Sequence, residues 1–226
     1  MKSPTTYIIA LLAGMLIFVG LPLLGWGSGT LSTFFENPVR IAYIVVIFGL
    51  QIFALLYNPQ VGRNQENRKS GITTPKLDLI LIQVFSLAIV ILAPYSDRHS
   101  FSVFASTDLL RYIGLVLVIP GFILMQAGEK HLAKQFSIQV TLQEDHKLIQ
   151  SGPYKVIRHP RYLGIVTFFL GISFVFRSLL TTILVIVLAA ILIWRIFTEE
   201  NLLHQEFGTA WETYCKTSWR LIPFIF

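Results

Sequence analysis

The chain has 226 residues, of which 54% are hydrophobic and only 13% charged, and its formal net charge at pH 7 is +6. This composition excludes a water-soluble domain of that length and indicates a chain whose solvent is the lipid bilayer. A positive net charge would suggest a nucleic-acid partner for a soluble protein. In a membrane protein the positions of Lys and Arg indicate the orientation in the bilayer instead, so no nucleic-acid partner is predicted.

Six apolar runs are candidates for membrane-spanning helices, which need roughly 17 to 25 such residues. The first run follows Lys2 and resembles a signal peptide, but it is longer than the roughly 7 to 15 residues of a signal core, and no A-x-A cleavage site follows it. The fifth run is the shortest and contains Gly164 and Gly171. We therefore predict an all-α integral membrane protein with about six transmembrane helices, over residues 7–24, 39–57, 77–95, 109–127, 162–176 and 179–197.

Lysine and arginine are unevenly distributed over the segments between these runs. If both termini and the segments 58–76 and 128–161 lie on one side of the membrane, that side holds fourteen of the eighteen basic residues. Cytoplasmic segments of membrane proteins carry the excess of Lys and Arg. We therefore expect both termini and the segment 128–161 to be cytoplasmic. The basic residues left for the other side are Arg40, Arg98, Arg111 and Arg177.

The sequence changes character near residue 127, and we divide it there. Residues 1–127 hold four spans with few ionisable residues inside them, and we interpret this part as a transmembrane scaffold. Pro120 and Gly121 are expected to kink or loosen its fourth helix. Residues 128–226 hold the polar motifs, and we interpret this part as the half that carries the chemistry.

Local patterns predict the elements of the second half. The fourth helix is expected to continue through residues 128–134, and residues 136–141 alternate apolar and polar side chains as a strand does. Proline disfavours a helical conformation of the residue before it, so the fifth helix should begin near Pro160. An amphipathic segment should continue the sixth helix to a C-cap at Gly208, and a shorter helix should cover residues 210–216.

Two groups of polar residues flank the last two spans. Ionisable side chains this close to a bilayer are costly unless they bind something. Since one helical hairpin separates the two groups in the sequence, both could face a single pocket, which we interpret as an active site. The first group spans His146 to Tyr162, and the second consists of Arg195, Glu199 and Glu200.

The order and spacing of these residues form a specific pattern. It reads His146-x-Leu-Ile-x-Ser-Gly-Pro-Tyr154, then Arg158-His159-Pro160-x-Tyr162-x-Gly164, then Arg195-x3-Glu199-Glu200 and a Phe-Gly-x2-Trp-x2-Tyr ending. This pattern resembles the isoprenylcysteine carboxyl methyltransferase family and its bacterial relatives, a wider group that also includes phospholipid N-methyltransferases. The resemblance covers roughly residues 120 to 226, and the first four spans carry no matching motif.

The resemblance implies S-adenosylmethionine as methyl donor, bound between the segment 128–161 and the cytoplasmic ends of the last two spans. It implies that Arg195 meets the substrate, with Arg195 and Glu199 as the catalytic pair. The implied acceptor is lipophilic and lies in the membrane, and the α-carboxylate of an isoprenylcysteine is the leading candidate. The cofactor contacts carried over by motif position are Gln139, His146, Lys147, Leu148, Ile149, Tyr154, Arg158, His159, Pro160, Arg161, Tyr162, Glu199 and Glu200.

The physical chemistry of methyl transfer agrees with such a site. Transfer from a sulfonium needs in-line placement of the nucleophile and the methyl group rather than covalent help from the protein. A carboxylate or thiolate that attacks a sulfonium cation loses charge as it reacts, so removing the pair from water lowers the barrier. A site at the membrane boundary would let a lipid enter from the bilayer and a polar cofactor enter from the cytoplasm.

Several of these residues also have plainer interpretations. Arg195 and Glu199 are four residues apart and could form an intrahelical ion pair. Arg158 and Arg161 could contact lipid phosphate at the membrane surface. No metal site is predicted, because the spacings of the nearby histidines match no zinc pattern. These histidines are His131, His146 and His159.

Four other functions stay open at the level of the sequence. An ethanolamine phospholipid N-methyltransferase would need a base for its amine, and a small-thiol S-methyltransferase would use the same donor. A nicotinamide-dependent membrane reductase of the sterol type looks similar in its C-terminal region, although this chain lacks a glycine-rich dinucleotide fingerprint. A non-catalytic membrane protein would use the same residues to bind lipid.

Overall fold

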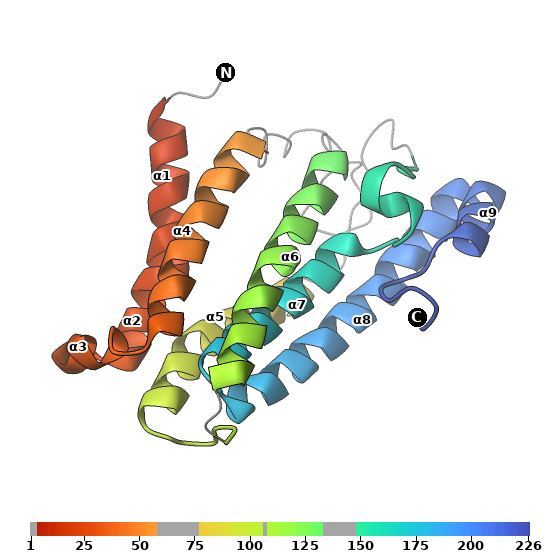
Figure 1. Cartoon of the computed structure of the whole chain (residues 1–226). Coiled ribbons are helices and arrows are strands. Elements are labelled where there is room, and N and C mark those ends of the chain that lie inside the picture. Colours follow the sequence, from red (N-terminus) through yellow and green to blue (C-terminus); the bar gives the residue numbers. More distant parts are fainter. Residues whose placement is uncertain (1–3, 58–76, 106–107, 133–147) are drawn as a thin grey trace.

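The computed structural model describes residues 4–57, 77–105, 108–132 and 148–226. In this part of the chain the named elements are all helical, which confirms the predicted all-α membrane fold (Figure 1). In chain order they are α1 (Pro4–Met15), a π-helical turn (Leu16–Gly20), α2 (Leu21–Trp26), a 3-10 turn (Ser28–Thr30), α3 (Leu31–Phe34), α4 (Pro38–Tyr57), α5 (Leu77–Arg98), α6 (Asp108–Leu132), a 3-10 turn (Gly152–Lys155), α7 (Pro160–Val175), α8 (Leu179–Phe207) and α9 (Thr209–Thr217).

All six predicted apolar runs are helical, but they differ in length. Five segments are long and apolar enough to cross a membrane, namely Tyr7–Trp26 and the helices α4, α5, α6 and α8. The sixth run is α7, which has 16 residues. At 1.5 Å per residue it is about 24 Å long, against about 30 Å of bilayer hydrocarbon.

The start of α7 and the hairpin that follows it are set by single residues. Pro160 is the first residue of α7, as predicted, and His159 before it is not helical. After α7 the chain turns at Arg177, whose φ is 50°. Ser178 then caps α8 by accepting a hydrogen bond of 3.1 Å from the backbone N–H of Thr181. Because α7 and α8 are joined this tightly, the start of α7 and the end of α8 lie at the same end of the molecule.

α7 is held most closely by α6, through glycines spaced seven residues apart on both helices. A Cβ atom placed on Gly121 of α6 would lie 2.5 Å from the backbone nitrogen of Phe168, and one on Gly164 of α7 would lie 2.7 Å from the carbonyl oxygen of Gly121. Gly114 and Gly171 make the same kind of contact one step along the helices. Small residues let helix backbones approach closely inside a membrane. α6 continues through Pro120 as one helix, and Gly121, the residue after it, lies in the contact with α7.

The first span joins the bundle where its helix loosens. The π-helical turn contains Phe18, whose carbonyl oxygen accepts a hydrogen bond of 2.8 Å from the Tyr43 hydroxyl on α4. The ring of Phe18 meets the ring of Phe168 edge to face, with 5.2 Å between centroids. A π-turn leaves carbonyl groups outside the regular helical ladder, which here gives the buried Tyr43 a partner.

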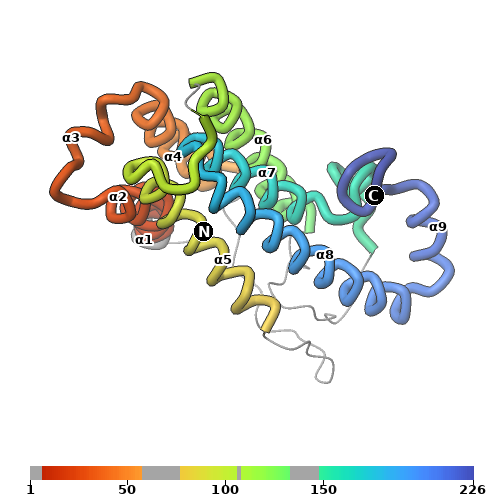
Figure 2. The backbone as a smooth tube through the Cα atoms, turned by 90° about the horizontal axis from the view of Figure 1, so that it is seen from below, coloured from red at the N-terminus to blue at the C-terminus, as the bar shows by residue number. Residues whose placement is uncertain are grey.

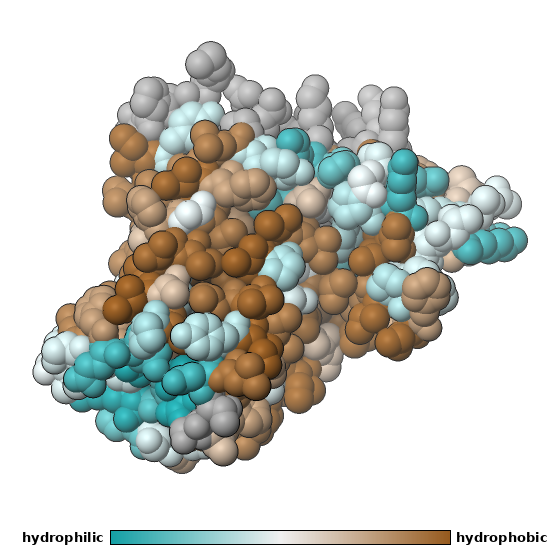
Figure 3. Space-filling model, in the orientation of Figure 1, coloured by the Kyte–Doolittle hydropathy of each residue, from teal (hydrophilic) through white to brown (hydrophobic). Residues whose placement is uncertain are grey.

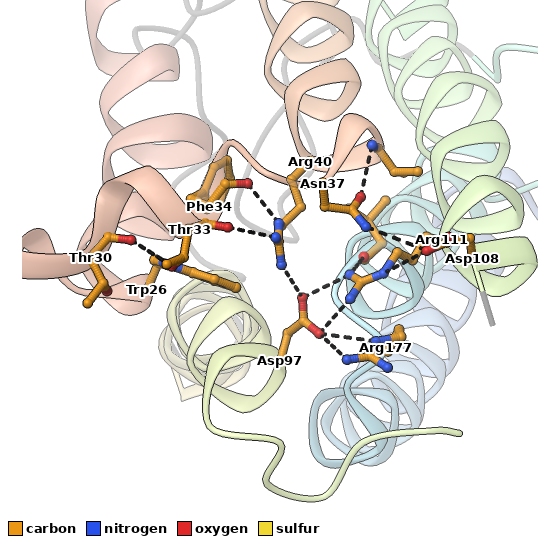
Figure 4. Close-up of polar contacts among 12 residues, drawn as sticks. Trp26, Thr30, Thr33, Phe34, Asn37, Arg40, Asp97, Asp108, Arg111 and Arg177 are labelled. Carbon is orange, nitrogen blue, oxygen red and sulfur yellow. Dashed lines mark hydrogen bonds and ion pairs between the residues drawn. The ribbon is translucent and has the colours of Figure 1, made fainter. Parts of the chain in front are cut away.

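One end of the bundle is tied together around Asp97, near the end of α5 (Figure 4). Its two carboxylate oxygens accept from Arg40 of α4 at 3.3 Å, from Arg111 of α6 at 2.8 Å and from Arg177 of the hairpin turn at 2.8 Å. Arg98, the neighbour of Asp97, donates to the carbonyl oxygen of Trp26. The four arginines that the sequence assigned to one side of the membrane therefore lie at one end of the molecule.

The surface follows the same division. Figure 3 shows apolar side chains across the middle of the molecule, with hydrophilic side chains gathered at the lower left, where α5 ends, and near α9. α8 has 29 residues and is about 43 Å long, which is longer than the roughly 30 Å thickness of the hydrocarbon layer. Its last turns therefore extend beyond that layer. Gly208 ends α8 with a φ of 49°, which confirms the predicted C-cap, and α9 follows.

Candidate functional site

The two polar groups predicted to face each other are joined in the structure where α7 begins and α8 leaves its apolar stretch. Tyr162, in the first turn of α7, donates from its hydroxyl to Oε1 of Glu199 on α8. The ring of His159 lies parallel to the ring of Tyr162, with 5.6 Å between centroids and 4° between planes. Nδ1 of His159 lies 3.5 Å from Oε2 of Glu199, and Nε2 lies 3.4 Å from Oε1 of Glu200. The chain therefore places one imidazole between two carboxylates.

Arg195 lies one turn before Glu199 on α8 and is held from two sides. Its Nε donates to the Tyr162 hydroxyl at 2.8 Å and lies 3.2 Å from Oε1 of Glu199. Its Nη1 donates to Oδ2 of Asp78, in the first turn of α5. The intrahelical pair of Arg195 and Glu199, considered as a plain interpretation, is thus present, but it is one contact within a network of three helices.

Glu200 is the second carboxylate of the site, and it pairs with two arginines of the C-terminal half. Oε1 accepts from Nε of Arg158 at 2.9 Å, and Oε2 accepts from Nε of Arg220 at 2.8 Å. Arg158 also donates to the carbonyl oxygens of Ser218 and, at 3.3 Å, of Cys215. These contacts fasten the end of the chain to α8.

The backbone before His159 runs beside the backbone after α9. The N–H of Arg158 donates to the carbonyl of Trp219 at 2.7 Å, and the N–H of Trp219 donates to the carbonyl of Val156 at 2.8 Å. The N–H of His159 donates to the carbonyl of Arg220 at 3.0 Å. The C-terminal segment thereby fixes the stretch that delivers His159 to the two glutamates.

The side of the site toward α6 is held by Tyr154 and Arg161. The Tyr154 hydroxyl donates to the carbonyl of Gly128 at 3.3 Å, and its own carbonyl accepts from the Tyr214 hydroxyl at 2.7 Å. Burial raises the pKa of Tyr154 far above its usual range and that of Tyr214 to about 12, so both phenols stay neutral donors. Nε of Arg161 donates to Oε1 of Glu129 on α6 at 2.8 Å.

His159 is buried, and its charge depends on its neighbours. Burial by itself lowers the pKa of an imidazole, but the hydrogen bonds and charges of Glu199 and Glu200 outweigh it, so the pKa of His159 is raised above the ordinary value. A raised pKa favours the imidazolium form. That form donates from both ring nitrogens and so suits a ring that lies between two carboxylates.

Most of the predicted site residues that the structure describes fall in these contacts. His159, Tyr162, Arg195, Glu199 and Glu200 form one network, and Pro160 starts the helix that carries part of it. The remaining predicted residues lie around this network or outside the described part. Arg158, Tyr154 and Arg161 surround it. Leu148 and Ile149 are half-buried residues before the 3-10 turn. Outside the described residues lie Gln139, His146 and Lys147, together with the expected strand 136–141.

Two residues of the network were missed by sequence reasoning. Asp78 and Arg220 belong to no motif, and each pairs with a residue of the predicted site. The sequence does give one indication for Asp78. It is a lone carboxylate just inside an apolar run, where a charge is costly without a partner, so a partner could have been expected. Both arginines of the first polar group, Arg158 and Arg161, form ion pairs within the chain, a different partner from the lipid phosphate considered for them.

Known proteins are similar to the part of the chain that forms this site. The model of the family described as phospholipid methyltransferase matches residues 109–210, which span α6 to the start of α9. A probable protein-S-isoprenylcysteine O-methyltransferase of Oryza sativa subsp. indica is 26% identical over 164 residues, which cover 70% of this chain and 84% of the rice protein. Protein-S-isoprenylcysteine O-methyltransferase A of Arabidopsis thaliana is 29% identical over 119 residues, 50% of this chain and 58% of its own length.

A shorter stretch of the chain is similar to a different class of enzyme, the sterol reductases. A Delta(14)-sterol reductase of Mus musculus is 34% identical over 83 residues, which cover 35% of this chain but only 20% of the reductase. The methyltransferase relatives match longer stretches and larger shares of both chains. The comparisons therefore support the isoprenylcysteine carboxyl methyltransferase family for this chain over the sterol reductases.

Proposed function

We propose that this protein transfers a methyl group from S-adenosylmethionine to a lipophilic acceptor in the membrane, and that the acceptor group is the α-carboxylate of an isoprenylcysteine. The observation that carries the proposal is the single network formed by His159, Tyr162, Arg195 and Glu199. It joins the two polar motifs of the family across α7 and α8, inside the segment that the family model matches.

The described residues fit the polar end of such a cofactor. The Glu199 side chain keeps 22% exposure, whereas those of Arg195 and His159 keep 3% and 6%. A carboxylate that is both oriented and exposed can accept hydrogen bonds from ribose hydroxyls or an amino group. Tyr154, Tyr162 and His159 are the predicted neighbours of the adenine ring. Bound at this site, S-adenosylmethionine supplies an electrophilic methyl group on a sulfonium.

Arg195 is the group proposed to receive the acceptor. Its planar guanidinium matches a carboxylate through two parallel donors, which Lys does not offer. It lies in the part of α8 that comes before the polar last turns, and we expect the lipid to approach it from the bilayer. Holding an anionic nucleophile in a site without bulk water, in line with the methyl group, is the main contribution expected from this chain.

We also propose that both termini and the segment 128–161 face the cytoplasm. The clustering of Arg40, Arg98, Arg111 and Arg177 at the end opposite to His159 supports this orientation. Single cysteines at His99 and Asn201, in a background with the native Cys215 replaced by Ser, would be labelled in intact cells with a maleimide that does not cross membranes. Labelling at position 99 without labelling at position 201 is expected, and the reverse pattern would invert the topology.

We also propose that residues 1–127 form a scaffold and that residues 128–226 carry the chemistry, with one contribution from the scaffold to the site. The motifs of the family lie in the second half, but Asp78 of the first half contacts Arg195. The family match also begins at residue 109, within the fourth span.

The first experiment is calorimetric titration of the detergent-purified protein with S-adenosylhomocysteine, the demethylated product, and in parallel with reduced nicotinamide dinucleotides. Saturable binding of S-adenosylhomocysteine is expected. Prenylated cysteines, ethanolamine phospholipids and small thiols are then compared as acceptors. The first two are chosen because the chain is similar both to protein-S-isoprenylcysteine O-methyltransferases and to the phospholipid methyltransferase family. Binding of nicotinamide cofactor alone would move the protein to the reductases, and binding of neither ligand would favour a non-catalytic protein.

A further inference from the structure

Asp78 is the one acidic residue from the first half of the chain that contacts this network among the described residues. It lies 117 residues before Arg195 in the sequence and reaches it because α5 packs along α8 (Figure 2). The Asp78 side chain keeps 9% exposure, and its Oδ2 accepts from Nη1 of Arg195. A buried carboxylate next to a buried guanidinium balances a charge that would otherwise be costly in a membrane.

The other oxygen of Asp78 is also engaged. Oδ1 accepts a hydrogen bond of 2.8 Å from the backbone N–H of Leu79. Asp78 is in the first turn of α5, where helix N–H groups lack helical partners and the helix dipole favours a negative charge. Both oxygens are therefore held, and the carboxylate is anchored to the end of a long helix.

Glu199 is the second carboxylate on Arg195, and it also accepts from the Tyr162 hydroxyl and lies beside His159. Its contact with Nε of Arg195 is 3.2 Å long and runs between residues four apart on one helix. Its side chain is more exposed than that of Asp78, at 22% against 9%. Of the two carboxylates, Glu199 is thus the one that can exchange Arg195 for a ligand, and Asp78 is the one that stays.

We propose that Asp78 is a positioning residue that holds the Nη1 side of Arg195, so that the opposite edge of the guanidinium, where Nε contacts Tyr162 and Glu199, is presented to the carboxylate of the acceptor. The inference rests on the proposed function and adds the contribution of α5 to acceptor recognition. A guanidinium whose plane is already fixed loses less freedom when it binds a carboxylate. Without Asp78, Arg195 would keep its charge and its contacts with Tyr162 and Glu199, but it would lose the contact that fixes Nη1.

The test compares Asp78→Asn and Asp78→Glu with the wild-type protein and with Asp108→Asn. Asp108 is a matched control, because it also lies in the first turn of a helix and within 3.7 Å of an arginine, Arg111, but its side chain is 70% exposed. The probe acceptor is N-acetyl-S-farnesylcysteine. Its kcat and KM are measured together with the Kd of S-adenosylhomocysteine, and its own Kd is measured by calorimetry without cofactor.

We expect Asp78→Asn to raise the acceptor KM by roughly ten- to a hundredfold, with a small change in kcat and an unchanged Kd for S-adenosylhomocysteine. Asp78→Glu should recover part of the loss, because it restores a negative charge beside Arg195, and Asp108→Asn should behave like the wild type. An unchanged acceptor KM in Asp78→Asn overturns the proposal. A lower KM would also overturn it, because Asp78 would then compete with the acceptor for Arg195.

Failure of the proposed function gives a different pattern. If the wild-type protein does not bind S-adenosylhomocysteine, the methyltransferase assignment of this site fails, and binding of the probe alone then decides the role of Asp78. Weaker binding of the probe to Asp78→Asn than to the wild type supports a positioning role, and equal or absent binding overturns it. If Asp78→Asn lowers the affinity for S-adenosylhomocysteine as much as it lowers the affinity for the probe, Asp78 supports the whole site and not Arg195 alone, which also overturns the inference.

Discussion

Arg220, near the end of the chain, donates from Nε to Oε2 of Glu200 on α8 at 2.8 Å. Its guanidinium also lies over the rings of Phe197 and Phe226, at 5.0 and 5.3 Å from their centroids. The residue beside Arg220, Trp219, pairs by backbone hydrogen bonds with the stretch before His159. The C-terminal segment is therefore part of the support of the candidate site.

The first prediction concerns this support. Arg220→Gln removes one charged partner of Glu200, while Arg158 and His159 stay in place, so a loss of about 1 kcal/mol in stability is expected. Thermal unfolding in detergent measures the loss, and Lys216→Gln in the last turn of α9 is the control. A melting temperature of Arg220→Gln equal to that of the control would show that the contact is too solvated to matter.

The second prediction is a dependence of stability on pH. The pKa of His159 is raised in the folded protein above its ordinary value of about 6.5. The stability from its two glutamate partners is then fully present below the unfolded pKa and is lost as pH rises through the folded pKa. The wild-type protein should therefore become less stable as pH rises from about 6.5 through the raised pKa of His159. His159→Gln should be less stable at low pH and should show a flatter profile.

His204 provides the control for this prediction. It pairs with Glu212 at 3.1 Å, but both side chains are exposed. His204→Gln should therefore keep the wild-type dependence of melting temperature on pH. If His159→Gln and the wild type lose stability in parallel as pH rises, other groups are responsible for the dependence.

The third prediction tests the close packing of α6 and α7. Gly121→Ala places a methyl group against the backbone of Phe168 and should destabilise the protein by about 1 to 3 kcal/mol. Gly49→Ala on α4 is the matched control, since among the described residues a Cβ atom there would meet nothing within 4 Å besides the adjacent backbone of its own helix, and it should be neutral or slightly stabilising. Equal melting temperatures for the two variants would mean that α6 and α7 move apart without loss.

Local signals in the sequence were enough to place most helices. The start of α7 at Pro160 and the end of α8 at Gly208 follow from the backbone preferences of proline and glycine, which act within a few residues. The apolar runs predicted the spans because hydrocarbon imposes one length on all of them. α7 departs from that length, and its interruption by glycines turned out to be its contact with α6.

Partners across helices could not be predicted in the same way. Asp78 and Asp97 are carboxylates at the two ends of α5. Asp78 pairs with Arg195 of α8, and Asp97 pairs with Arg40 of α4 and Arg111 of α6. A sequence shows the cost of such charges but not which helix will lie beside them. The same limit applies to Arg158 and Arg161, because lipid phosphate and a carboxylate of the chain present similar oxygens to an arginine.

The fourth prediction concerns the end opposite to the site. Asp97→Ala leaves Arg40, Arg111 and Arg177 around a missing carboxylate, and breaking a buried ion pair from one side costs about 3 to 5 kcal/mol. Asp108→Ala removes an exposed carboxylate 3.7 Å from the same Arg111 and should cost much less. Denaturation midpoints in detergent compare the two. Similar midpoints would show that the arginines find other partners when Asp97 is absent.

The fifth prediction separates the roles of the two residues at the centre of the proposed site. Glu199→Gln keeps the size of the side chain but removes the charge that would bind the cofactor, so the Kd of S-adenosylhomocysteine should rise about ten- to a hundredfold. Arg195→Lys keeps the charge beside Asp78 but loses the planar fork, so it should mainly raise the acceptor KM. Calorimetry and steady-state kinetics on both variants give the two quantities.

The two variants control for each other, because they lie one turn apart on α8 and share the Tyr162 hydroxyl. A general disturbance of the site would change the cofactor Kd and the acceptor KM in both variants by similar factors. If Glu199→Gln changes mainly the cofactor Kd and Arg195→Lys changes mainly the acceptor KM, then Glu199 and Arg195 contact different ligands. If Arg195→Lys weakens S-adenosylhomocysteine as much as Glu199→Gln does, Arg195 belongs to the cofactor side, and the acceptor carboxylate must be recognised elsewhere in the protein.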